Sequence, residues 1–112
     1  LMHSIGASNA ALMLMTGDPI MAEKALAWGL VSEVVPQTDL MDRARAIAEA
    51  IAARAPIAAE TAKANLRAAV SMPLDKAIEY ERDLQTICFA TADAAEGRAA
   101  FKEKRQPVFE RR

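Results

Sequence analysis

The chain has 112 residues, which is enough for one domain or for part of a larger one. Hydrophobic residues make up 53% of it and aromatic residues only 4%, so the core must be built mainly from small side chains that each bury little area. The 14 Lys and Arg nearly balance the 15 Asp and Glu, which excludes a strong overall field for nucleic acid or an anionic membrane. We therefore expect marginal stability, with apolar surface left over for a partner.

Two short helices and one strand are predicted in the first third of the chain. Ser8 is typical of an N-cap for a helix over residues 9–16, which Gly17 would end. A second helix is predicted over residues 21–28, before Gly29. The β-branched residues 30–35 predict a strand, and Ile20 is placed to pair with it in a short β-ribbon.

Three longer helices follow, and prolines separate them. Thr38 is a plausible N-cap for a helix that runs to about Arg54. Pro56 opens the next helix, predicted over about 57–70, and Pro73 precedes a third over 74–89. Each shows an apolar stripe at helical spacing, which for the third helix includes Glu81. A carboxylate inside a stripe is more often paired with an arginine at a helix junction than catalytic.

The last predicted helix carries the candidate binding residues. Asp93 and Glu96 have capping-box spacing, with Asp as the N-cap, and Pro107 is expected to stop the helix. Between these limits one face would present the following residues: Gly97, Phe101, Lys104 and Val108. A glycine inside a helix is unfavourable, so something is expected to approach its backbone closely.

This face suits a ligand that has an apolar arm and a phosphate. The Lys104 ammonium can meet a phosphate, and the Phe101 ring can pack against a thin flexible chain. The residues from Phe101 to Arg112 also form a local basic end, which fits a small anion better than a duplex. The alternative is a closing helix with Phe101 in the core and Lys104 in water.

No catalytic or metal-binding arrangement is found. His3 is the only histidine and lies near the start of the chain, so a histidine-based triad has no support. No cluster has metal-ligand spacing, and the four glycines are isolated from one another. We therefore assign no catalytic residue and no metal ligand.

The single cysteine, Cys88, excludes an internal disulfide and is typical of a reducing compartment. No apolar run reaches the length of a membrane span, and the first residues lack a signal-peptide pattern. The chain also opens without Met on a segment typical of folded structure, which hints at a truncation. We expect a cytoplasmic protein with no membrane and no nucleic-acid partner.

Two separate blocks of the chain resemble the crotonase superfamily, the enoyl-CoA hydratase/isomerase family. The first runs from Leu14 to Pro36 and reads LMTGDPIMAEKALAWGLVSEVVP. The second runs from Asp93 to Phe101, DAAEGRAAF, and is followed by Lys104, Arg105 and Pro107. Ile5 and Gly6 also resemble a family block, although His3 stands where arginine is usual. The resemblance covers the chain in order and with the family's spacing.

The resemblance implies a mainly α, helical C-terminal lobe that belongs to a larger α/β fold, a spiral of ββα units whose N-terminal core is absent here. Residues 1–36 would end that core, and residues 37–112 would form a lobe that covers CoA and builds the oligomer, a trimer or hexamer. The family's catalytic glutamates and oxyanion-hole donors belong to segments before Leu1. The chain alone is therefore expected to be inactive.

For the site, the resemblance implies that Phe101 and Lys104 contact coenzyme A. The phenylalanine would lie along the acyl or pantetheine arm, and the lysine would meet the 3′-phosphate. A coenzyme A thioester would be the substrate, with no covalently bound cofactor. The parent reaction would be hydration of a trans-2-enoyl-CoA. The alternatives are a stand-alone helical oligomerisation module without chemistry, and part of another crotonase, such as an isomerase or a carnitinyl-CoA dehydratase.

Overall fold

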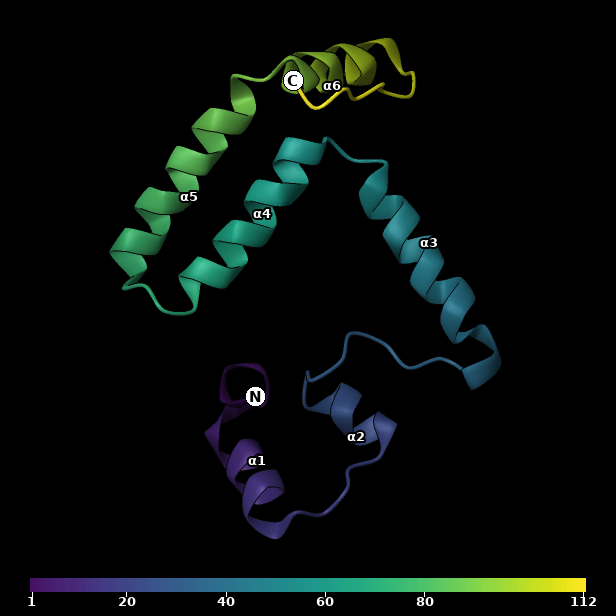
Figure 1. Ribbon diagram of the computed structural model, residues 1–112, viewed down its shortest axis with the longest axis vertical. Coiled ribbons are helices and arrows are strands. Elements are labelled where there is room, and N and C mark those ends of the chain that lie inside the picture. The colour runs from purple at the N-terminus through teal and green to yellow at the C-terminus, as the bar shows by residue number, and fades with distance from the viewer. The chain divides into compact units, whose positions relative to one another are not determined.

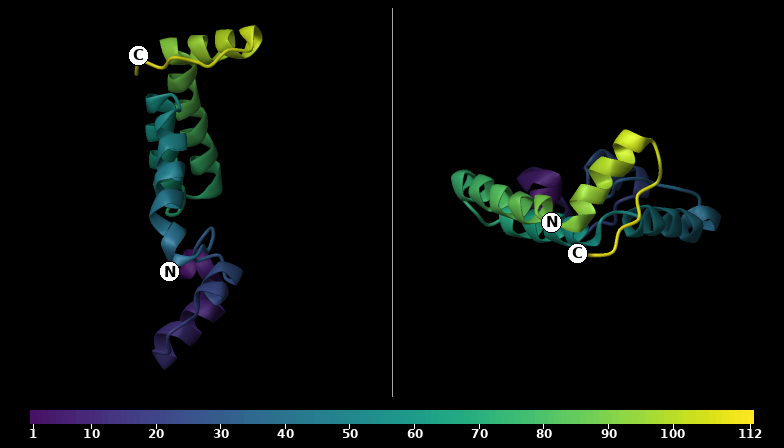
Figure 2. Two further views of the ribbon diagram at one scale, coloured as in Figure 1. Left: turned by 90° about the vertical axis from the view of Figure 1, so that its right-hand side faces the viewer. Right: turned by 90° about the horizontal axis from the view of Figure 1, so that it is seen from above.

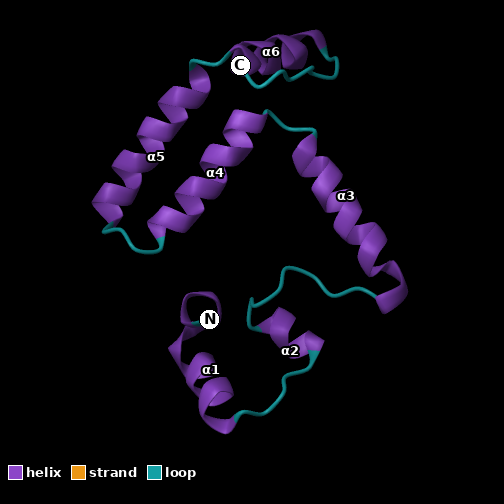
Figure 3. Cartoon of the chain, viewed as in Figure 1, coloured by secondary structure: helices purple, strands orange, loops and turns teal.

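The computed structural model describes residues 1–112 and contains helices and loops without strands (Figure 1 and Figure 3). The mainly α prediction is confirmed. The chain divides into two compact units, Leu1–Arg43 and Ala44–Arg112, and each is described by itself. The division predicted after residue 36 concerns roles in a larger fold and stays a prediction.

The first unit begins with helix α1 (Met2–Thr16), which starts earlier than the predicted residue 9. The carbonyl of Leu1 accepts the N–H groups of Ser4 and Ile5, so a helical turn already forms there. Gly6, with φ 77° and ψ 162°, then breaks the helix, a conformation that a Cβ would disfavour. The helix ends as predicted, with Gly17 in the left-handed conformation at φ 70°.

Helix α2 (Ala22–Ala27) forms close to its predicted bounds, but the predicted β-ribbon is wrong. Residues 30–35 form bends and irregular chain rather than a strand. A β-branched run needs a partner for its backbone groups, and here the N–H of Leu30 instead bonds the carbonyl of Ala25 at 2.9 Å, as part of the turn that closes α2. Within this segment, the Glu33 carboxylate forms an ion pair with the Arg43 guanidinium at 2.9 Å.

A 3₁₀ turn, η1 (Gln37–Asp39), leads into helix α3 (Leu40–Ala52). Thr38 therefore does not cap the helix, because its hydroxyl donates to the side chain of Asp39 at 2.8 Å. The boundary between the two units falls inside α3, after Arg43.

The second unit is built on a hairpin of helices α4 (Pro56–Ala69) and α5 (Leu74–Phe89), which pack against each other (Figure 1). Pro56 occupies the first turn of α4 as predicted, where its missing N–H costs nothing. The loop between the helices ends at Pro73. Across the hairpin, the Thr61 hydroxyl lies 3.0 Å from the Cys88 sulfur, so the cysteine serves as a packing residue.

Few apolar side chains are buried. The buried hydrophobic residues are small or near the chain start, and they are Ile5, Ala10, Ala25 and Ala100. Large aliphatic side chains on the hairpin, including Leu66 and Leu74, are mostly exposed. This agrees with the expectation of apolar surface left over, and no helix is both long enough and apolar enough to cross a membrane.

Candidate functional site

The candidate residues lie on or next to helix α6 (Ala92–Glu103), which begins two residues earlier than the spacing of Asp93 and Glu96 predicts. Its N-cap is Thr91, whose hydroxyl oxygen accepts the N–H of Ala94 at 3.0 Å. The prediction that Asp93 caps the helix is therefore wrong. A hydroxyl two residues upstream takes the cap position, which leaves the Asp93 carboxylate free for other donors.

Those donors come from the end of the chain. Asp93 is 3% exposed, and its two carboxylate oxygens accept the backbone N–H groups of Glu110 at 2.7 Å and of Arg111 at 2.9 Å. Its own N–H donates to the carbonyl of Arg112 at 2.8 Å. The C-terminal segment, residues 106–112, consequently runs back along α6 (Figure 2).

Glu96 holds the same segment one turn further along. Its carboxylate receives two N–H groups of the Arg105 guanidinium, one of them at 2.8 Å, and the N–H of Val108 at 2.9 Å. The bond from Arg105, and after it the bond from Val108, lowers the pKa of Glu96 to about 2. Arg105 also donates to Glu103, and together the two carboxylates raise the pKa of the guanidinium. Glu96 is therefore ionised and doubly engaged at neutral pH.

Helix α6 ends at Lys104, which adopts the left-handed conformation at φ 55° and ψ 37°. The N–H of the next residue, Arg105, bonds the carbonyl of Ala100 at 3.0 Å, as in a Schellman motif. The prediction that Pro107 stops the helix is wrong, because the left-handed turn ends it three residues earlier. Val108 consequently lies in the C-terminal segment and not on a helical face with Phe101.

Phe101 is 88% exposed, so the alternative that places its ring in the core is excluded for this chain. Lys104 is also exposed and forms none of the ion pairs of the structure. The two residues thus present an apolar ring and an unpaired cation at the end of α6. This is the chemistry expected of a contact for a phosphate with an apolar arm, and whether either touches such a ligand stays a prediction.

The expectation for Gly97 was that something approaches its backbone. The approaching group is the Phe109 ring of the same chain, which would lie 3.7 Å from a Cβ built on the glycine. That distance is ordinary contact, so the space would accept a methyl group. Neither this contact nor the backbone conformation requires a glycine at position 97.

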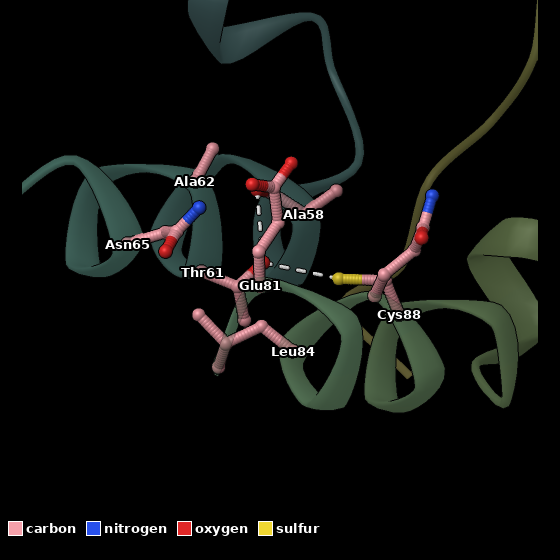
Figure 4. Close-up of a pocket in the computed structure, with 8 residues that line it drawn as sticks. Ala58, Thr61, Ala62, Asn65, Glu81, Leu84 and Cys88 are labelled. Atoms are coloured by element: carbon pink, nitrogen blue, oxygen red, sulfur yellow. Dashed lines mark hydrogen bonds between the residues drawn. The ribbon is translucent and has the colours of Figure 1, made fainter. Parts of the chain in front are cut away.

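The second unit has surface pockets, and three of them are lined by residues other than Phe101 and Lys104. Two of them border the C-terminal segment. The third, of about 220 Å³, lies between α4 and α5 and is lined by residues that include Asn65, Glu81 and Cys88 (Figure 4). Glu81 makes no ion pair, contrary to its predicted pairing with an arginine, and the Asn65 side-chain oxygen has no hydrogen-bond donor.

The rest of the chain shows no arrangement suited to acid–base or metal chemistry. No group of three or more His, Cys, Asp and Glu side chains is placed to hold a metal ion, and His3 is exposed in the broken start of α1.

Sequence reasoning missed the role of the acidic pair. The spacing of Asp93 and Glu96 predicts a helix cap, whereas in the structure their carboxylates hold the C-terminal segment. One available signal was Thr91, a second candidate cap residue two positions upstream of Asp93. The other was Pro107, which predicts extended chain after the helix, with N–H groups that need acceptors.

Comparison with known proteins identifies the family. The sequence profile of the enoyl-CoA hydratase/isomerase family matches residues 1–112, the whole chain. The chain belongs to this family. A probable enoyl-CoA hydratase of Mycobacterium tuberculosis is 42% identical over 112 residues, which are 100% of this chain and 44% of that protein. A carnitinyl-CoA dehydratase of Salmonella paratyphi A is 40% identical over 104 residues, covering 89% of this chain and 40% of that protein.

The fold agrees with that assignment. The crystal structure of an enoyl-CoA hydratase from Bacillus anthracis superposes with a TM-score of 0.96 at 35% identity, over 99% of this chain and 43% of that one. The chain thus spans less than half the length of the relatives it matches, and it corresponds to the C-terminal portion of the family. The prediction of a crotonase-type C-terminal lobe is confirmed.

Proposed function

We propose that this chain is the C-terminal part of an enzyme that hydrates trans-2-enoyl-CoA, and that it supplies oligomer contacts and part of the coenzyme A pocket. The family match over residues 1–112 carries this proposal, together with relatives named as hydratases. The coenzyme A thioester would be the substrate, and no resident cofactor is needed. We also propose a cytoplasmic location, which the lone cysteine favours.

The proposed division of labour is that this chain grips the coenzyme while an N-terminal core performs the chemistry. Two glutamates and two backbone N–H donors of that core would handle water, the α-proton and the thioester oxygen. The chain itself offers no such set near Phe101 and Lys104. We therefore expect the 112-residue chain alone to be inactive.

The experiment that tests this division of labour measures hydration of crotonyl-CoA by two proteins. One is the 112-residue chain, and the other is a fusion that places before it the residues of the Mycobacterium tuberculosis relative that precede the match. We expect turnover by the fusion and none by the chain. Robust turnover by material that mass spectrometry shows to be 112 residues long would overturn the proposal.

The proposed coenzyme contacts are tested in the same fusion. Phe101→Ala should leave the free energy of unfolding within about 0.5 kcal/mol of the parent value, because the ring is exposed, and should weaken coenzyme A binding. Lys104→Ala should lower the preference for coenzyme A over 3′-dephospho-coenzyme A. Unchanged binding constants in both variants would remove Phe101 and Lys104 from the site.

A different crotonase reaction is the second candidate, favoured by the 40% identity to a carnitinyl-CoA dehydratase. Assaying the fusion cannot separate these reactions, because the N-terminal core sets the chemistry. The discriminating measurement is a substrate panel of crotonyl-CoA, a 3-enoyl-CoA and crotonobetainyl-CoA on an enzyme whose core is the natural one for this chain.

A helical interaction module without chemistry is the third candidate, favoured by the exposed aliphatic side chains of the α4–α5 hairpin. Sedimentation of the 112-residue chain with and without coenzyme A distinguishes it. A monodisperse small oligomer whose sedimentation coefficient does not change with coenzyme A supports the interaction module. An aggregating monomer supports a lobe that requires its core.

A further inference from the structure

Only two residues other than glycine adopt a positive φ, and both belong to the end of α6 and the segment that follows it. They are Lys104 at φ 55° and Arg111 at φ 62°. The left-handed conformation is unfavourable for a residue with a Cβ, so it persists only where neighbouring contacts hold it. Strained positions of this kind occur preferentially at functional sites, and one of the two here is the candidate phosphate contact.

Backbone bonds to Ala100 and Phe101 close the turn at Lys104, and the side-chain contacts of the residues that follow it converge on Glu96. The residue directly after Lys104 is Arg105, whose guanidinium is bonded to both Glu96 carboxylate oxygens and, through Nε, to Glu103 at 2.6 Å. Beyond it, the N–H of Val108 donates to Glu96 at 2.9 Å. The chain on the C-terminal side of Lys104 is therefore fixed at two points by one carboxylate.

Asp93 anchors the remainder of the segment in the same way. Its carboxylate accepts the N–H of Arg111, the other left-handed residue, and that of Glu110. Because Asp93 and Glu96 lie three residues apart, they share one face of α6. Residues 105–112 are held against that face, and this fixes the direction in which the chain leaves Lys104.

None of these contacts involves the side chain of Lys104. The Lys104 ammonium takes part in none of the hydrogen bonds between side chains and none of the ion pairs, although Glu103 adjoins it in sequence and Arg105 captures that carboxylate. Arg105 thus engages the carboxylate that adjoins Lys104 in sequence, and the Lys104 ammonium forms no ion pair.

We propose that Glu96 is a positioning residue for coenzyme binding. Through Arg105 and Val108 it holds Lys104 in the left-handed turn, which keeps the free ammonium at the end of α6, one turn from exposed Phe101, where it meets the 3′-phosphate. This inference rests on the proposed function of Lys104. It adds Glu96, which contacts no ligand itself and acts by orienting Lys104.

The test compares binding of coenzyme A and 3′-dephospho-coenzyme A to the fusion enzyme by titration calorimetry. Loss of one charge-assisted contact corresponds to about a tenfold change, so Lys104→Ala should lower the preference for coenzyme A about tenfold. Glu96→Gln keeps an acceptor for Val108 but breaks the ion pair, and should lower the preference by roughly threefold or more. Binding of the dephospho form should be unchanged in both.

Two further variants separate positioning from general loss of structure. Arg105→Gln should lower the preference at least as much as Glu96→Gln, because it breaks the same ion pair and also releases Glu103. The double variant should lose no more than Arg105→Gln alone. Glu79→Gln breaks an exposed pair with Lys76 on α5 and should leave the preference unchanged.

A measurement on the 112-residue chain does not depend on activity or on the fusion. Backbone chemical shifts and the HN–Hα coupling of Lys104 report its φ angle directly. Glu96→Gln should move both away from values for the left-handed conformation, whereas Glu79→Gln should not.

The outcomes distinguish the two proposals. If Lys104→Ala loses the preference and Glu96→Gln keeps it, Glu96 does not position the lysine, while the function of Lys104 stands. If the parent fusion shows no preference, or Lys104→Ala retains it, both ideas fail together. A left-handed Lys104 that persists in the Glu96→Gln chain also overturns the positioning role.

Discussion

At the scale of single residues, Asp93 is the only buried charged side chain, and every donor that compensates its burial comes from the backbone. Asp93→Ala leaves the N–H groups of Glu110 and Arg111 without acceptors and should lower the free energy of unfolding by about 2–3 kcal/mol. Asp93→Asn, which keeps one acceptor oxygen, should cost less. Urea unfolding checks both, with Asp83→Ala as the control.

Asp83 is a suitable control because its side chain is exposed and pairs only with its neighbour Arg82. Its replacement should change the free energy of unfolding by less than about 0.5 kcal/mol. Equal losses in the two alanine variants would mean that the C-terminal segment is not held by Asp93.

Two glycines allow opposite effects of the same substitution. Gly97 has helical angles and room for a methyl group 3.7 Å from Phe109, so Gly97→Ala should stabilise the chain by about 0.5–1 kcal/mol. Gly17→Ala meets no steric neighbour, yet its φ of 70° should make it destabilising by about 1 kcal/mol. Thermal unfolding measures both, and a destabilised Gly97→Ala chain would show that Phe109 packs more closely.

At the scale of elements, the attachment of the C-terminal segment to α6 should depend on pH through Glu96. Its pKa is lowered from 4.5 to about 2 by Arg105 first and by Val108 second. A lowered carboxyl pKa stabilises the folded state in its ionised form. The contribution is therefore fully present above about pH 4.5 and is lost as the pH falls towards 2.

Hydrogen exchange of the Val108 amide should follow that loss, with protection decreasing between about pH 4.5 and 2 after correction for the intrinsic exchange rate. In Glu96→Gln the amide oxygen remains an acceptor for Val108 but does not titrate in this range, so the protection should vary little between pH 4.5 and 2. Protection that stays constant in the parent chain down to pH 2 would contradict the assignment.

The elements that local signals define were predictable, and those that depend on distant partners were not. Pro56 begins α4 and Pro73 directly precedes α5, and both helices form at the predicted positions. The β-ribbon failed because residues 30–35 have strand composition without a pairing partner, a condition that no local pattern reveals. Glu96 and Arg105 are nine residues apart across a helix end, so their ion pair follows from the turn at Lys104 and not from periodicity.

At the scale of the whole chain, large apolar side chains lie exposed on both helices of the α4–α5 hairpin. Leu66 is 73% exposed and Leu74 77%, on the two helices of the hairpin, while no large side chain is fully buried anywhere. Patches of exposed aliphatic residues are typical of interfaces. The isolated chain should consequently self-associate as its concentration rises, which sedimentation velocity measures.

Replacing these side chains separates association from stability. Leu66→Gln with Leu74→Gln should weaken self-association and leave the free energy of unfolding within about 1 kcal/mol, because neither side chain is buried within the chain. Ala100→Leu is the control with the opposite expectation, because Ala100 is 1% exposed. Overpacking at this position should lower the free energy of unfolding by about 1–3 kcal/mol and leave self-association unchanged. If the double variant unfolds while Ala100→Leu is tolerated, these leucines belong to a core of the chain itself and the interface lies elsewhere.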